Sequence, residues 1–291
     1  MRRNRTGSGG SAPMHNAGWP RDFLDNRFVY AVISQRARGL SIGVNLNPES
    51  YCNFDCVYCE VKRGNARQEK PVDVNVLSSE LTKLMELAWA DKLRDMPRFH
   101  KIPAELLGLK ELALSGNGEP TLCPNFHQAV ETVLRVRSQQ IHFLKIVLIT
   151  NSAGLFLPDV QKGWRKLAME DEIWLKLEAG TQKYMKRVNQ PADMTLQNVM
   201  ANILRIGQER PIVIQSLFPL LQGEEPGLEE IDGYIHRLQE LMAGGAQISL
   251  VQIYSAHRPA QNPDCGHLAL NSLSAIARRV REQTRLRVEV F

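Results

Sequence analysis

Residues 40–59 read LSIGVNLNPESYCNFDCVYC, an apolar run followed by a loop that holds three cysteines. The run 40–46 (LSIGVNL) has the composition of a β-strand covered on both faces. Cys52, Cys56 and Cys59 follow it in the spacing C-x3-C-x2-C. Three thiolates on so short a loop can each ligate one iron of a [4Fe-4S] cluster, which leaves the fourth iron without a protein ligand. The stretch therefore predicts an open metal centre at the carboxyl end of a buried strand.

Two other interpretations of the cysteines stay open at this point. A structural zinc site needs four ligands, usually from two C-x2-C pairs, so Cys123 and His127 would have to complete it. Three unrelated buried cysteines are the second alternative. Cys123 and Cys265 are too few to hold another cubane cluster. Five cysteines, three of them crowded together, make a poor disulfide framework, which favours a reducing compartment.

The chain beyond this stretch alternates between two hydrophobic periods. Apolar runs predict strands at 40–46, 110–115, 145–150, 172–178, 211–218 and 247–254, with a short last strand at 286–290. Stretches of helical period predict helices at 77–91, 125–137, 159–169, 194–208, 229–242 and 271–283. Successive βα units require parallel strands with right-handed crossovers. This pattern fits a barrel or an open sheet, and in both folds ligands bind at the carboxyl ends of the strands.

The bulk composition is that of a globular α/β protein. Of the 291 residues, 43% are hydrophobic and 23% are charged, so residues 22–291 are expected to form one domain. Residues 1–21 are rich in Gly, Ser, Pro and Arg, and they predict a flexible tail, with a transit peptide as the alternative. No apolar run approaches a membrane span or a signal peptide, which favours a cytoplasmic protein with no membrane partner. The net charge of +5 leaves a nucleic-acid partner open.

Polar residues gather where the predicted strands end. Gly116, Gly118 and Glu119 follow the second strand, and Asn151 follows the third. Lys176 and Glu178 are two residues apart in the fourth, so their side chains point to the same side. Charges in an apolar strand are costly unless they are paired or functional, and the alternative to a ligand site here is a mutual salt bridge. Weaker candidates for pocket residues are Gln215, Ser216, Gln252 and Tyr254.

The cysteine spacing after the first strand resembles that of the radical S-adenosylmethionine (radical SAM) superfamily, and the resemblance covers about residues 38–260. It implies an α/β fold, a partial (β/α)6 barrel with parallel strands. It further implies that S-adenosylmethionine (SAM) binds the open iron, with Tyr58 beside the adenine. Gly116, Gly118 and Glu119 resemble the glycine-rich element that holds the methionyl amino group, and a side chain at Gly118 is expected to block that approach without removing iron. Asn151, Lys176 and Glu178 complete the expected cofactor-binding set.

The resemblance also implies an activity: reductive cleavage of SAM, followed by abstraction of a hydrogen atom from a substrate that the sequence does not identify. A flavodoxin or ferredoxin is the electron donor that the superfamily implies. The strings 47–52 (NPESYC), 116–122 (GNGEPTL), 176–181 (KLEAGT) and 251–259 (VQIYSAHRP) look similar to small Fe–S oxidoreductases related to the wybutosine-forming tRNA enzymes. Those enzymes use a second cluster from N-terminal cysteines, and this chain has no cysteine before Cys52. Their substrate chemistry is therefore not carried over.

Two rival functions remain from the sequence. One is an activase that installs a glycyl radical on a partner enzyme, which resembles the same superfamily. The other is a zinc-stabilised RNA-binding module, which would use the basic balance and the arginines of the last predicted helix, Arg278, Arg279 and Arg281. No catalytic side chain is identified from the sequence.

Overall fold

The computed structural model describes residues 23–64 and 68–291, so the predicted tail at 1–21 lies outside the described residues. Within them a central sheet of eight strands has the order β1-β2-β3-β4-β5-β6-β8-β10. The strands are β1 (Val29–Ser34), β2 (Gly39–Asn45), β3 (Leu109–Ser115), β4 (Lys145–Thr150), β5 (Glu172–Lys176), β6 (Ile212–Leu217), β8 (Ile248–Tyr254) and β10 (Val288–Val290). From β2 to β10 every neighbouring pair is parallel, and only β1 is antiparallel to its neighbour.

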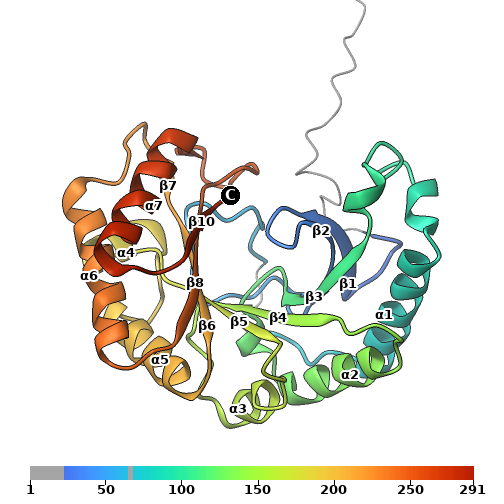
Figure 1. Ribbon diagram of the computed structural model, residues 1–291. Helices are drawn as coiled ribbons and strands as arrows, with labels where there is room; N and C mark the ends of the chain where they lie inside the picture. Colours follow the sequence, from blue (N-terminus) through green and yellow to red (C-terminus); the bar gives the residue numbers. More distant parts are fainter. Residues whose placement is uncertain (1–22, 65–67) are drawn as a thin grey trace, which may run out of the picture.

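The sheet is curved, and its helices cover the convex side (Figure 1). They are α1 (Val74–Trp89), α2 (Phe126–Ser138), α3 (Pro158–Trp164), α4 (Gln182–Val188), α5 (Leu196–Glu209), α6 (Leu228–Ala243) and α7 (Leu270–Thr284). Short 3-10 turns occupy Lys92–Asp95, Ala104–Leu106 and Pro120–Leu122. The strands β1 and β10 lie at the two ends of the curved sheet and do not pair with each other. The fold is thus a partial barrel, which confirms the α/β fold with parallel strands.

Local sequence signals explain where the main helices begin. The Asp73 side chain accepts hydrogen bonds from the first backbone N–H groups of α1, at Asn75 and Val76. Thr195 and Asn198 form a reciprocal capping box at the start of α5. Each of these helices then buries one apolar stripe against the sheet, as the helical period predicted.

Four elements were not predicted. The strand β1 extends the sheet by pairing with β2, and its sequence VYAVIS carries an apolar, β-branched signal that the analysis did not use. The strands β7 (Pro219–Leu221) and β9 (Cys265–His267) form a small antiparallel pair, and α4 is only two turns long. The predicted strand 172–178 is also too long: β5 ends at Lys176, so Glu178 belongs to the loop that follows.

The inside of the barrel is apolar in its middle and polar towards both ends. A buried cluster of Val147, Trp174 and Val213, packed by Ile149 and Leu250, forms part of the wall of the middle. Strand alternation places these residues on the concave side, away from the helices. Among the described residues, no helix has the length and apolar character that a membrane crossing requires.

Candidate functional site

A cavity of about 360 Å³ opens at the carboxyl ends of the strands and extends into the barrel. Its lining includes all three cysteines of the loop and every other residue predicted to bind the cofactor: Tyr58, Gly116, Gly118, Glu119, Asn151, Lys176 and Glu178. Of the weaker candidates, Gln215 and Tyr254 line it as well. Residues that are up to 202 positions apart in the chain, from Cys52 to Tyr254, therefore meet in one site.

The cysteine loop is fixed in place by backbone pairing with the segment after α4. The Val57 N–H donates to the Val188 carbonyl at 2.9 Å, and the Asp55 N–H donates to the Gln190 carbonyl at 3.2 Å. Between the last two cysteines, the Cys59 N–H donates to the Cys56 carbonyl at 2.9 Å. These bonds hold a loop without regular secondary structure, so the positions of the sulfur atoms do not depend on a bound metal alone.

Each cysteine sulfur faces one N–H donor. The donors are the Phe54 backbone at 3.5 Å from Cys52 Sγ, Asn189 Nδ2 at 3.7 Å from Cys56 Sγ, and Arg63 Nη2 at 3.3 Å from Cys59 Sγ. Hydrogen bonds to the sulfurs are one way in which proteins tune iron–sulfur clusters. Asn189 and Arg63 were not predicted to belong to this site. Arg63 lies four positions after Cys59, but Asn189 carries no sequence signal for this role.

Arg63 also joins the cysteine loop to the glycine-rich loop. Its Nη1 donates to the Asn117 carbonyl at 3.1 Å and its Nη2 to the Phe54 carbonyl at 3.2 Å. Arginine suits this position because its planar fork can bond several acceptors at once.

Two of the three thiols, those of Cys52 and Cys56, are largely shielded from water. Burial, together with the Glu119 carboxylate, raises the pKa of Cys52 to about 11. Burial, together with the Glu178 carboxylate, raises the pKa of Cys56 to about 12. Thiolate is the form that ligates metal, so binding of iron here would displace protons.

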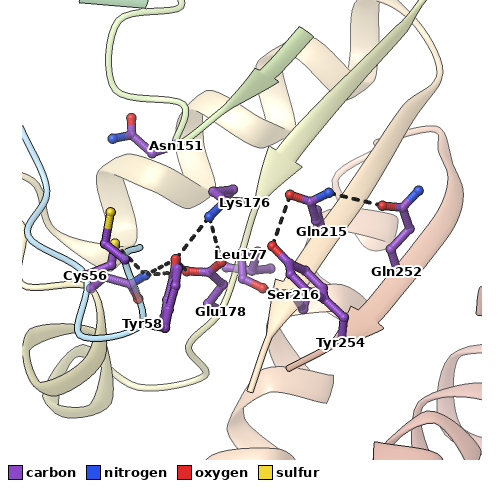
Figure 2. A network of polar contacts seen from close by, with 12 residues as sticks. Cys56, Tyr58, Asn151, Lys176, Leu177, Glu178, Gln215, Ser216, Gln252 and Tyr254 are labelled. Atoms are coloured by element: carbon purple, nitrogen blue, oxygen red, sulfur yellow. Dashed lines mark hydrogen bonds and ion pairs between the residues drawn. The ribbon is translucent and has the colours of Figure 1, made fainter. Parts of the chain in front are cut away.

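A network of polar contacts lies directly beside Cys56 (Figure 2). The Tyr58 hydroxyl and Asn189 Nδ2 both donate to Glu178 Oε2. Lys176 Nζ donates to the Tyr58 hydroxyl at 3.1 Å and lies 3.3 Å from Glu178 Oε1. The predicted salt bridge between Lys176 and Glu178 therefore exists. Both residues also line the cavity, so the salt bridge and a ligand site are compatible.

Charge in this network is fixed by burial and pairing. Burial alone would lower the pKa of Lys176, but the Glu178 carboxylate outweighs it, so the pKa lies above its usual value. Burial raises the pKa of Tyr58 well above its usual value, which keeps its hydroxyl a neutral donor. Glu178 Oε1 is buried and accepts no hydrogen bond from the described residues, and its polar contact is the Lys176 ammonium at 3.3 Å. A carboxylate oxygen in this state can still accept a hydrogen bond from a ligand.

The Glu119 side chain is held by neighbouring donors, and its contact with a cofactor stays a prediction. Its side chain is only 3% exposed and accepts hydrogen bonds from the Thr121 N–H and hydroxyl, the Thr150 hydroxyl and the Asn151 N–H. Burial raises its pKa, and these four donors lower it in part. Since both carboxylate oxygens already have partners, Glu119 positions the ends of β3 and β4 towards each other.

The glycine-rich loop packs directly against its neighbours. A Cβ atom on Gly118 would lie 1.8 Å from the Tyr51 carbonyl oxygen, and one on Gly116 would lie 2.2 Å from Asn45 Oδ1. Gly118 is thus required because the chain entering the cysteine loop rests on it. Close approach of a cofactor to Gly118 stays a prediction.

Replacing Gly118 by valine should displace the cysteine loop, because the new side chain overlaps the Tyr51 backbone. We expect iron content after anaerobic reconstitution to fall together with SAM affinity, measured by iron assay and by equilibrium binding. The matched control is Gly227→Val, since a Cβ there meets nothing within 4 Å. A Gly118→Val protein with full iron content and weakened SAM binding would show instead that Gly118 is needed for close approach of the cofactor.

The remaining candidates divide between the cavity and its support. Asn151 Nδ2 donates to Asn53 Oδ1 at 2.9 Å, which ties the end of β4 to the cysteine loop. Ser216 was wrongly placed in the pocket: it is buried behind the strand, where its hydroxyl bonds the Leu177 carbonyl and the Tyr234 hydroxyl. Strand alternation explains the difference, because Gln215 and Ser216 point to opposite faces. Gln252 does not line the cavity itself, but it accepts a hydrogen bond at 3.2 Å from Gln215, which does.

The ligands that a zinc site would need lie elsewhere. Cys123 is packed in the hydrophobic core, and neither it nor His127 lines the cavity with the three cysteines. Within residues 23–64 and 68–291, no group of three or more His, Cys, Asp or Glu side chains converges on a single metal ion. A cubane does not require such convergence, because each of its thiolates ligates a different iron.

Two of the three arginines of the RNA-binding alternative contact neighbouring elements, and the third, Arg278, is exposed. Arg279 forms an ion pair with Asp232, and Arg281 donates to the Val288 carbonyl at 2.6 Å. Both residues thereby attach α7 to its neighbours. An RNA-binding face on this helix stays a prediction, and two of its arginines also serve to hold the helix in place.

Comparison with curated proteins finds distant relatives. The chain is 24% identical over 183 residues to a UPF0026 protein of Helicobacter pylori, a match that covers 62% of this chain and 52% of the relative. It is 27% identical over 183 residues to a UPF0026 protein of Synechocystis, covering 62% and 60% respectively. The match thus spans little more than half of the length of these relatives. No protein-family model matches the chain.

Comparison with solved structures identifies the fold. A structure of TYW1 with a lysine-pyruvate adduct bound superposes with a TM-score of 0.55, at 14% identity, over 88% of this chain and 84% of that one. Streptococcus suis SuiB bound to S-adenosylmethionine gives a TM-score of 0.55 at 12% identity, over 84% of this chain and 49% of that one. These neighbours are radical SAM partial barrels, and the present chain has the same fold.

Proposed function

We propose that this chain is a radical SAM enzyme in which Cys52, Cys56 and Cys59 hold a [4Fe-4S] cluster at the mouth of the barrel. The observation that carries the proposal is the placement of the three cysteines in one cavity with the network of Tyr58, Lys176 and Glu178. A structural metal would not require an ion pair of Lys176 and Glu178 beside it.

The residues present fit the cluster. Three sulfurs, each with an N–H donor, suit a cubane that keeps one iron free of protein ligands. The free coordination position is the feature that separates a catalytic metal site from a structural one. Arg63 adds a positive charge 3.3 Å from Cys59 Sγ, which offsets part of the negative charge of three thiolates.

The residues also fit a zwitterionic cofactor head group. Lys176 would pair with the carboxylate of SAM, and Glu178 Oε1, which accepts no hydrogen bond in the protein, would accept one from its hydroxyl or amino groups. Tyr58 would lie against the adenine. When bound, the cluster and SAM would supply one-electron reduction and hydrogen-atom abstraction, with the electron coming from a flavodoxin or ferredoxin.

The chain itself provides shape, charge and exclusion of water. The Tyr58 hydroxyl and Asn189 Nδ2 hold the Glu178 carboxylate beside Cys56, so the charged groups are oriented before a ligand arrives. Below them, the apolar layer of Val147, Trp174 and Val213 offers water few hydrogen-bond partners in the middle of the barrel. A dry interior protects a reactive intermediate from side reactions.

The test is release of 5′-deoxyadenosine. Anaerobically reconstituted and chemically reduced protein should release it slowly from SAM even without substrate, because cleavage requires only the cluster, an electron and bound SAM. Product would be measured by chromatography, with the Cys56→Ala protein as the control. Complete absence of 5′-deoxyadenosine from protein with a full, reducible cluster would overturn the proposal.

A further inference from the structure

The far end of the cavity carries charged groups that the proposed cofactor site does not use. The Glu111 side chain lines the cavity from the third residue of β3, in register with Ser41 of β2 and with Lys145, the first residue of β4. Arg36 lines it from the turn between β1 and β2. Both lie near the amino ends of the parallel strands. At about 3.3 Å per residue, this end is roughly 13 Å from the carboxyl ends where the cysteines lie.

Glu111 has unused hydrogen-bonding capacity. It is 3% exposed, and Ser41 Oγ donates to its Oε1 at 3.1 Å. Its Oε2 is buried and accepts no hydrogen bond from the described residues. Lys145 does not supply one, since its Nζ bonds Glu172 at 2.9 Å. Burial raises the pKa of Glu111, because a buried carboxylate without a full set of donors is less stable in its charged form.

Arg36 has unused capacity of the opposite kind. Its guanidinium lies 4.6 Å from the centre of the Tyr254 ring and 6.0 Å from that of Trp174, and both rings line the cavity. Among the described residues it has no hydrogen-bond acceptor and forms no ion pair with Glu111, although the two interact electrostatically. A stacked guanidinium with free N–H groups is well suited to bind a carboxylate through two parallel hydrogen bonds.

We propose that Arg36 and Glu111 form the substrate subsite, and that it binds the head group of a free α-amino acid, the carboxylate on Arg36 and the ammonium on Glu111. This inference rests on the proposed function, since it places a substrate below the SAM site. A ligand with both charges is favoured because the subsite offers one cation and one anion that do not satisfy each other. An amino acid held there would extend its side chain past Trp174 towards the cysteines, so the reacting carbon would lie in the side chain.

The test is ligand-observed saturation-transfer NMR on the full chain, with and without SAM, using each of the twenty standard L-amino acids as the probe. For each amino acid that binds, the amine lacking the carboxylate and the acid lacking the amino group are measured next. We expect at least one amino acid to bind, and each single-charge analogue to bind about tenfold more weakly or worse. Arg36→Gln and Glu111→Gln should each produce a loss of the same size.

The matched controls are Arg38→Gln and Glu289→Gln. Arg38 lies on the same turn as Arg36, and Glu289 lies on β10. The two form an ion pair at 3.8 Å, and neither lines the cavity. Both variants should keep wild-type affinity. Thermal denaturation checks folding, and Arg36→Lys, which keeps the charge but loses the planar fork, serves if Arg36→Gln fails to fold.

The outcomes separate this inference from the proposed function. If no amino acid binds, if a single-charge analogue binds as well as its parent, or if binding survives both substitutions, the inference is wrong. None of these results concerns the cluster. Absence of 5′-deoxyadenosine with intact amino-acid binding would instead overturn the proposed function and leave the subsite.

Discussion

Each of the substitutions Cys52→Ala, Cys56→Ala and Cys59→Ala should remove most of the iron that the protein holds after anaerobic reconstitution. The wild-type chain is expected to bind about four irons and four sulfides, with brown colour and absorbance in the visible range. Losing one thiolate leaves two irons without a protein ligand, and a cube held by two cysteines dissociates readily. Iron and sulfide assays on gel-filtered protein measure the effect.

The other two cysteines provide the controls. Cys123 is buried in the main core, and Cys265 packs behind the cysteine loop against the cluster of Val57, Val188 and Leu221. Cys123→Ala and Cys265→Ala should keep nearly full iron content, with Cys123→Ala costing some stability because it leaves a small cavity. If either residue proves as necessary as the three loop cysteines, the open-iron assignment is wrong. Zinc in place of iron in freshly purified protein would argue for the structural alternative.

Glu178→Gln should both destabilise the fold and slow SAM cleavage. The Glu178 side chain is 1% exposed, and its loss of charge leaves Lys176, which is 24% exposed, without its ion-pair partner. We expect about 2–4 kcal/mol of lost stability, somewhat discounted for the partial exposure of the lysine. The fall in 5′-deoxyadenosine release should be larger than unfolding explains, because the carboxylate also faces the cofactor cavity.

A second substitution separates the two effects. Lys176→Met in the Glu178→Gln background removes the unpaired charge, so it should restore part of the stability but none of the SAM cleavage. Glu172→Gln is the matched control on β5: its pair with Lys145 is about a third exposed on each side, so a cost below about 1 kcal/mol is expected. Denaturant unfolding and the product assay give the two readouts. Recovery of cleavage in the double variant would show that Glu178 acts only through Lys176.

Much of the fold could be predicted from the sequence because its signals are local. Buried parallel strands are apolar along their whole length, and the helices between them repeat every three or four residues. The strand β1 was missed although VYAVIS is a strand-like sequence, since an antiparallel addition breaks the βα alternation on which the prediction was based. The short elements α4, β7 and β9 are stabilised by tertiary contacts rather than by their own sequences.

The site divides along the same line. The sequence by itself determined the three cysteines and the polar residues at the strand ends. Metal-ligand spacing and charges in apolar strands can be recognised within short stretches of sequence. Only the tertiary structure decided that Glu119 holds the ends of β3 and β4, that Gly118 supports the Tyr51 backbone, and that Ser216 faces away from the cavity. It also added Arg63 and Asn189 beside the sulfurs, and Arg36 and Glu111 at the far end of the barrel. The physical reason is that the role of a polar side chain depends on which partners satisfy its hydrogen bonds, and these partners come from strands and loops that are distant in the chain.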